Sequence, residues 1–294
     1  MLRRGCKRQR VGGVDTDVLS ATAAVDEAND EFADVVDDAA VLVDDTLAAI
    51  DLLASRSAAG FNALELPPFV LQHQLYTVFP NRTFVDQNIH RLRSAGAIVT
   101  FRVPTGVDEV AVLRTAAYQD ELDRWLRVLR AQRERPQQAD PNVGHRHDAL
   151  ARFVRVLPGI SAQPSILARV LVEEMEKRRS PTAPSGDAQT TEDDIVWLQR
   201  LGFLRQTARL DDDVFQLSVP GVGALVSAVK KTRTALLATL KRMRYKEAAE
   251  AQLRKTPLKH SRLGWDYHLA DMEGRGLIRR TKVTSGTLVA VAQP

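Results

Sequence analysis

The stretch WDYHLADMEGRGLIRRTKV (residues 265–283) joins a helical pattern to a strand-like pattern through a glycine. Met272 lies four residues before Gly276, and the apolar pair Leu277 and Ile278 follows the glycine directly. Glycine adopts the left-handed backbone conformation that ends a helix at little steric cost. The stretch therefore predicts a helix that leads directly into a β-strand.

The same arrangement occurs twice more, in FVDQNIHRLRSAGAIVTFRV (84–103) and DDIVWLQRLGFLRQTA (193–208). The pairs Leu92 with Gly96 and Leu198 with Gly202 have the spacing of Met272 with Gly276. A turn and a returning strand are expected after each copy, the strands at residues 109–113, 214–219 and 287–292. The equal spacing favours three repeats of one unit, and the alternative is three αββ pieces of a single domain.

Helical patterns upstream of each copy complete the units. The expected helices are 44–54, 67–79 and 83–94 in the first, 118–131, 150–157 and 165–177 in the second, and 223–245, 246–255 and 263–273 in the third. Asn81 or Thr83 is the expected N-cap of the helix that closes the first unit. Polar segments at 132–148 and 178–194 are predicted loops.

Helices that end in a β-hairpin wing are typical of the winged-helix unit. The sequence therefore predicts a mainly α fold with small β-hairpins, of α+β class, built from three tandem winged-helix domains. Their expected bounds are 41–116, 117–219 and 220–294, after a tail at 1–40.

Composition excludes several classes of protein. The 294 residues contain one cysteine, which rules out a disulfide within the chain and argues against a thiolate zinc site. The six histidines show no metal-ligand spacing, and neither a metal nor a cofactor is expected. Without a membrane-length apolar run or a signal peptide, the protein is expected to be soluble and intracellular.

Charge is strongly segregated along the chain. Residues 1–10 contain Arg3, Arg4, Lys7, Arg8 and Arg10 without an acid, a cluster that predicts a nuclear localisation signal and residence in the nucleus. Residues 11–54 contain ten Asp and two Glu without any Lys or Arg. This acidic stretch is expected to stay unfolded to about residue 41 and to shield basic surfaces when DNA is absent.

The third unit carries the largest positive charge. Residues 221–294 contain fifteen Lys and Arg against five Asp and Glu, an excess of ten positive charges. Such a basic block indicates a polyanion as the binding partner.

The long helix of this unit orders part of that charge. Its helical period predicts that Lys230, Arg233, Lys241 and Arg244 share a surface stripe about 80° wide beside an apolar face. Further cations are expected to extend the double-stranded DNA surface: Lys231, Arg242, Lys246, Arg254, Lys255, Lys259 and Arg262, with Arg279, Arg280 and Lys282 on the wing. Trp265, Asp266, His268 and Asp271 are poorly suited to reading bases, so binding is expected to be largely independent of sequence.

No catalytic motif is present. Gly221-Val222-Gly223 lacks the further glycine and the lysine of a phosphate-binding loop. His145-Arg146-His147-Asp148 lies in a predicted linker without the asparagine of a kinase catalytic loop, and there is no Asp-Phe-Gly. The sequence therefore predicts a protein that is not an enzyme.

Three segments resemble the family named serine/threonine-protein kinase 19. They are LPPFVLQHQLYTVFPNRTFVD (66–86), VPGVGALVSAVKKTRTALLATLKRMRYKE (219–247) and LGWDYHLADMEGRGLIRRTKVTSGTLV (263–289). The resemblance implies tandem winged helices, nuclear residence and binding to double-stranded DNA. It also matches Lys231, Arg233, Lys241, Arg242, Arg244 and Arg254 to basic positions of the family's third domain.

The resemblance further implies a scaffold in transcription-coupled nucleotide excision repair. There the family helps to join the stalled RNA polymerase II complex and its ubiquitin-ligase subunit to the repair helicase complex. Two rivals stay open at this point. One is a winged-helix module that binds only proteins, and the other is a protein kinase, suggested by the family name alone. The oligomeric state is also open, with a homodimer among the alternatives.

Overall fold

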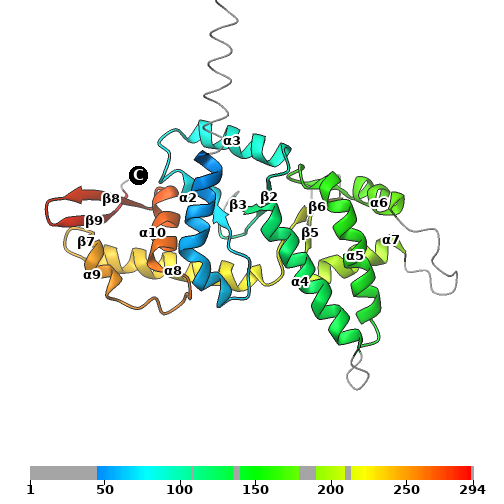
Figure 1. Cartoon of the computed structure of the whole chain (residues 1–294). Coiled ribbons are helices and arrows are strands. Elements are labelled where there is room, and N and C mark those ends of the chain that lie inside the picture. The colour runs from blue at the N-terminus through cyan, green and yellow to red at the C-terminus, as the bar shows by residue number, and fades with distance from the viewer. Residues whose placement is uncertain (1–44, 107–108, 135–139, 179–189, 209–212, 293–294) are drawn as a thin grey trace, which may run out of the picture. The chain divides into compact units, whose positions relative to one another are not determined.

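The computed structural model describes residues 45–106, 109–134, 140–178, 190–208 and 213–292. The expected tail at 1–40, including the basic cluster and most of the acidic stretch, lies outside these residues. Within them, each repeat has the same order of a helix, a short strand, two helices and a two-stranded wing (Figure 1).

The first unit begins with a helix over residues 45–62. It continues with β1 (Val70–Leu71), α2 (Gln72–Leu75), α3 (Arg82–Ser94), β2 (Ile98–Arg102) and β3 (Val110–Arg114). Asn81 is the N-cap of α3, because its side chain accepts a hydrogen bond from the backbone N–H of Phe84 at 3.1 Å. One of the two expected caps is thus confirmed.

The second and third units repeat this order, and the second has one additional helix. It contains α4 (Thr115–Arg133), α5 (Val143–Ile160), β4 (Ile166–Leu167), α6 (Ala168–Lys177), α7 (Thr191–Leu201), β5 (Leu204–Ala208) and β6 (Asp213–Leu217). The third contains α8 (Val222–Arg242), β7 (Glu247–Ala249), α9 (Glu250–Arg254), α10 (Trp265–Gly274), β8 (Ile278–Val283) and β9 (Gly286–Val291).

Each unit forms one antiparallel three-stranded sheet, with the strand that returns last in the centre. The orders are β1-β3-β2, β4-β6-β5 and β7-β9-β8. Gly96, Gly202 and Gly276 follow the closing helices with φ of 72°, 90° and 70°, the left-handed conformation expected of them. The predicted fold of three winged helices with small hairpins is confirmed.

The first strand of each sheet was not predicted. Helices are expected over 67–79, 165–177 and 246–255, but each of these segments contains a strand of two or three residues near its start. Val70 pairs with Val112, Ile166 with Phe215, and Ala248 with Val289. A strand this short shows no alternating pattern, and its partner lies more than forty residues further along the chain.

Both predicted loops are shorter than expected. Helix α5 starts at Val143, so His145, Arg146 and Asp148 lie on a helix rather than in a linker. The Asp140 carboxylate accepts from the backbone N–H of Asn142 and pairs with Arg146 at 2.5 Å, which stabilises this helix start. Helix α7 starts at Thr191, behind a reciprocal cap between Thr190 and Asp193.

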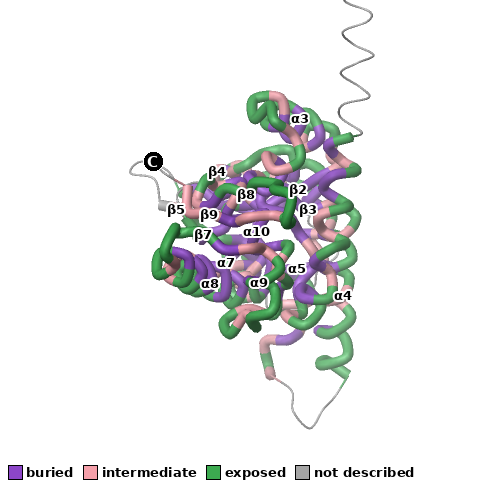
Figure 2. The backbone as a smooth tube through the Cα atoms, turned by 90° about the vertical axis from the view of Figure 1, so that its left-hand side faces the viewer, coloured by how far each residue is buried: buried purple, intermediate pink, exposed green. Residues whose placement is uncertain are grey.

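Three apolar clusters form the core, drawn as the buried residues of Figure 2. One lies within the first unit and includes Ile50, Leu75 and Val112. Another lies within the third and includes Leu240 and Met272. The largest runs from Phe61 through the second unit to Tyr267, so the units share a core and the expected domain bounds stay a prediction. Within the ranges described, no helix is long and apolar enough to cross a bilayer.

Candidate nucleic-acid interface

Helix α10 occupies the position that enters the DNA major groove in many winged helices. Here it packs against α2 of the first unit instead. Gln74 donates a hydrogen bond to the carbonyl of Tyr267 at 3.0 Å, and the ring of His73 lies 2.8 Å from the carboxylate of Asp271. At Gly274 any side chain would overlap the carbonyl oxygen of His73. The face of α10 that lies on α2 is therefore unavailable to base edges.

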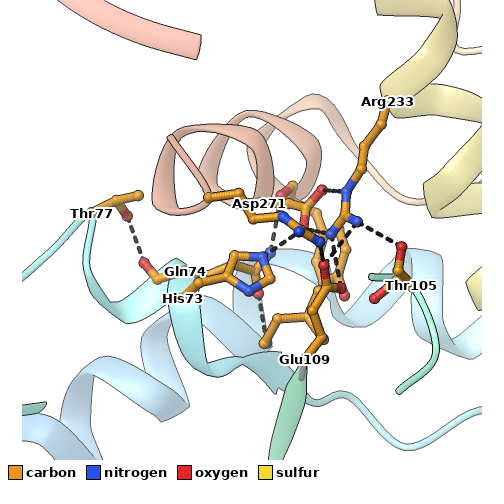
Figure 3. A network of polar contacts seen from close by, with 10 residues as sticks. His73, Gln74, Thr77, Thr105, Glu109, Arg233 and Asp271 are labelled. Carbon is orange, nitrogen blue, oxygen red and sulfur yellow. Dashed lines mark hydrogen bonds and ion pairs between the residues drawn. The ribbon is translucent and has the colours of Figure 1, made fainter. Parts of the chain in front are cut away.

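Arg233 lies at the centre of this junction, in the network drawn in Figure 3. Its guanidinium bonds both oxygens of Asp271, at 2.7 and 2.5 Å, and both oxygens of Glu109, at 3.0 and 3.1 Å. It also donates to the carbonyl of Thr105 at 3.1 Å. Arg275 forms a further ion pair with Glu109. The network therefore joins α8 and α10 of the third unit to α2 and the wing of the first.

The network keeps the Asp271 carboxylate ionised. Burial acts to raise the pKa of Asp271, but the hydrogen bonds from Arg233 and His73 outweigh it and hold the pKa below its ordinary value. The side chains of Asp271 and Glu109 are 0% and 4% exposed, so Asp271 depends on Arg233 for its charge balance, and Glu109 depends on Arg233 together with Arg275.

The predicted four-residue stripe is therefore wrong at two positions. Arg233 is only 7% exposed, because it lies at the edge of the stripe next to the apolar residue Leu240 and turns inward to the carboxylates. Arg244 lies beyond the end of α8 at Arg242, where the helical period no longer applies. Lys230 and Lys241 stay together, since eleven residues are close to three full turns.

Most of the other expected cations are exposed on the third unit. Besides Lys259 and Arg262 of the α9–α10 loop, nine of them form no ion pair with any acid in the described ranges: Lys230, Lys231, Lys241, Arg242, Arg244, Lys246, Lys255, Arg279 and Lys282. Arg254 instead pairs with Glu250 and Asp266, at 2.7 and 2.6 Å. Arg280 pairs with Glu273 and so is also partly neutralised. The nine unpaired side chains, here called the free cations, are the better candidates for phosphate contacts.

The free cations of α8 lie on a face without bulky side chains. Its other exposed residues are Gly223, Ala224, Ser227, Thr234, Ala235 and Thr239, and residues 222–242 contain no acid. Figure 2 shows that buried and exposed residues alternate along this helix. Small side chains allow a phosphodiester backbone to approach closely, while the cations supply the attraction.

The free cations gather in two places. Lys241, Lys246 and Arg279 lie around a groove between the end of α8 and the wing. Lys231 lies on a second, shallower hollow that also includes Lys259 and Arg262 of the α9–α10 loop. In the ranges described, no group of three or more His, Cys, Asp or Glu side chains is placed to hold a metal ion.

Sequence reasoning missed the buried network around Arg233. Asp271, Glu109 and His73 are brought together over sequence separations of up to 198 residues. No local pattern marks such partners. The position of Asp271 within the otherwise apolar part of α10 is the one signal in the sequence that could have suggested a buried ion pair.

Residues 45–290 match the protein family described as inactive serine-threonine protein kinase 19. The chain belongs to this family. Among its relatives, a Xenopus laevis protein named winged helix repair factor 1 is 29% identical over 236 residues, which cover 78% of this chain and 76% of that protein. The Mus musculus and Homo sapiens proteins of the same name are 28% and 27% identical, over 82% and 84% of this chain and 83% and 85% of their own lengths.

Membership of the inactive kinase 19 family also decides whether the chain is a protein kinase. The family is described as inactive, which confirms the expectation that the chain is not an enzyme. The alternative that the protein is a kinase, suggested by the family name, is thereby excluded.

In this member of the inactive kinase 19 family, α10 also contains a fully buried histidine. The ring nitrogens of His268 have no hydrogen-bond partner in the described part of the chain. Burial lowers the pKa of His268 to about 4 and outweighs the nearby Asp271 carboxylate, which acts to raise it. The folded protein therefore resists protonation at a pH where the unfolded chain accepts it.

This difference predicts a loss of stability in mild acid. The contribution of His268 to the free energy of unfolding is fully present above pH 6.5, the ordinary pKa of histidine. It falls by about 3 kcal/mol as the pH drops towards 4. Urea unfolding at pH 7 and pH 4.5 measures the effect. His268→Leu should flatten the pH dependence over this range, and an unchanged slope in that variant would show that other groups cause it.

Proposed function

We propose that this protein binds double-stranded DNA through the free cations of its third winged helix and contributes to DNA repair. The observation that supports this best is the set of nine exposed cations without an acidic partner, on a unit whose α10 is covered by α2. Contacts to phosphates position a protein on DNA without reading its sequence. Binding is therefore expected to be similar on unrelated duplexes.

The relatives support the repair role. Three proteins named winged helix repair factor 1 are 27–29% identical to this chain over more than three quarters of its length. The family resemblance implies a more specific role within DNA repair. In this proposal the protein is a scaffold in transcription-coupled nucleotide excision repair, between the stalled RNA polymerase II complex with its ubiquitin ligase and the repair helicase complex.

A titration of fluorescently labelled duplex DNA at several salt concentrations tests the DNA-binding part. Each phosphate contact releases counterions, so log K should fall linearly with log salt with a slope of about −0.9 per contact. Two duplexes of unrelated sequence should give the same slope and the same affinity. Absence of binding even at low salt would exclude the proposal.

One observation favours the rival function, a module that binds only proteins. Helix α10 already acts as a docking face, because it receives α2 of the first unit. A winged helix of this protein thus packs its third helix on protein rather than leaving it open to DNA. The salt titration distinguishes the two functions, since a pure protein-docking module would show no affinity for the duplex.

Nuclear residence is part of the same proposal and depends on residues 1–10. Neutral replacement of Arg3, Arg4, Lys7, Arg8 and Arg10 should shift a fluorescent fusion towards the cytoplasm, because import receptors recognise the clustered charge. Replacement of the free cations on α8 is the matched control, since it also lowers net charge. A fusion that stays nuclear without the cluster would place the signal in another segment.

A further inference from the structure

Tyr245 is the most exposed of the large apolar side chains in the described ranges, at 70%. It lies between the end of α8 and the start of β7. Aromatic side chains usually bury most of their surface, in a core or against a partner. An aromatic ring this exposed, beside several cations, is a combination typical of nucleic-acid-binding surfaces.

The loop backbone holds this ring outward. Lys246, the next residue, has a φ of 56°, a left-handed conformation that is uncommon for a side chain other than glycine or asparagine. Its N–H bonds the carbonyl of Met243 at 3.0 Å, and its carbonyl accepts from Val291 on β9 at 3.1 Å. The guanidinium of Arg244 lies 5.2 Å from the centre of the Tyr245 ring. The ring is thus presented from a loop anchored to the sheet.

The ring forms one wall of a groove with a cationic rim. Lys241, Lys246 and Arg279 line the groove together with Tyr245, and residues 290–292 (Ala-Val-Ala) provide small apolar side chains. Glu247 is the acid that lines it. The groove measures about 870 Å³, within the range of cavities that take small organic molecules. It therefore offers an aromatic face and apolar contacts to a flat group, with positive charge nearby for phosphates.

We propose that Tyr245 stacks on an unpaired base of DNA whose flanking phosphates contact Lys241, Lys246 and Arg279. This inference rests on the proposed function and specifies the class of DNA. In an intact duplex both faces of each internal base are covered by neighbouring bases, so Tyr245 has no face to contact. Unpaired bases can leave the stack, and every base presents the same kind of aromatic face, so stacking adds no sequence preference.

Binding to two related DNAs tests the inference. One is a fully paired duplex, and the other has the same length and flanks but contains a short central stretch of thymine–thymine mismatches. The parent protein should bind the mismatched DNA more tightly, and Tyr245→Ala should lower that affinity about ten-fold, the equivalent of one lost stacking contact. Affinity for the paired duplex should stay that of the parent.

Two further variants separate stacking from other roles. Tyr245→Phe keeps the ring and should retain the preference, whereas a contact made by the hydroxyl would be lost. Val283→Ala is the matched control, because Val283 is also an exposed apolar residue of the third unit. A 2-aminopurine within the mismatched stretch reports its stacking through its fluorescence, so binding of the parent should change the emission and binding of Tyr245→Ala should not.

The outcomes distinguish this inference from the proposed function. If the parent binds both DNAs but Tyr245→Ala leaves both affinities unchanged, or lowers them equally, Tyr245 does not recognise unpaired bases and only this inference fails. If the parent binds neither DNA at low salt, the proposed function fails with it. Loss of the preference in Tyr245→Phe would also contradict stacking, because that variant retains the aromatic face.

Discussion

Simultaneous replacement of Lys230, Lys241, Arg242 and Arg244 by Glu is expected to abolish duplex binding at physiological salt. All four side chains are exposed and unpaired within the described ranges, so the core and the buried network should stay intact. Non-specific DNA affinities lie near 10⁻⁴–10⁻⁶ M at this salt, and the loss of several phosphate contacts moves them beyond detection. Neutral replacement by Ala should weaken binding in steps, with the salt slope falling by about 0.9 for each contact removed.

The matched control reverses four exposed cations of the second unit. Arg127, Arg130, Arg133 and Arg205 to Glu changes the net charge by the same amount but leaves the third unit untouched. This variant should retain most of the affinity, and both variants should keep the circular-dichroism spectrum of the parent. If the four-fold reversal on the third unit binds as tightly as the parent, the DNA site lies elsewhere. Exposed Arg82 and Arg91 on α3, with neighbouring Arg93, would then be the next candidates.

The second large effect concerns stability. Arg233→Ala should lower the free energy of unfolding by about 3–5 kcal/mol, because it leaves the buried carboxylates of Asp271 and Glu109 without their shared partner. For a domain of this size the melting temperature should fall by about 10 °C. Differential scanning calorimetry or a thermal melt followed by circular dichroism measures the change.

Two other variants show whether the loss of stability comes from the buried ion pairs. Lys230→Ala, one turn away on the exposed face of α8, should change the melting temperature little. Arg233→Lys keeps the charge but cannot bond both carboxylates through a planar fork, so its loss should be intermediate. At a temperature where Arg233→Ala is fully folded, its duplex affinity should equal that of the parent. A selective loss of DNA binding with unchanged stability would instead return Arg233 to the DNA surface.

The fold was predictable where its cause is local. Gly96, Gly202 and Gly276 mark helix ends because only the backbone at those positions decides the turn, and all three were recognised. The short strands β1, β4 and β7 were not, because they exist through pairing with a distant strand. The same distinction applies to the site. Lys230 and Lys241 follow from the helical period, whereas the buried position of Arg233 follows from carboxylates supplied by α10 and by the wing of the first unit.

The contact between α2 and α10 also affects the order in which the chain can fold. His73 and Asp271 are separated by 198 residues, so the helix that covers α2 leaves the ribosome long after α2 itself. During synthesis the first unit must therefore wait, with His73 and Gln74 uncovered, until the 198 residues that separate His73 from Asp271 have been made. Contacts so distant in sequence form slowly, since a long loop must close before they contribute. The nascent protein thus passes through a stage in which this surface is open to chaperones and to other chains.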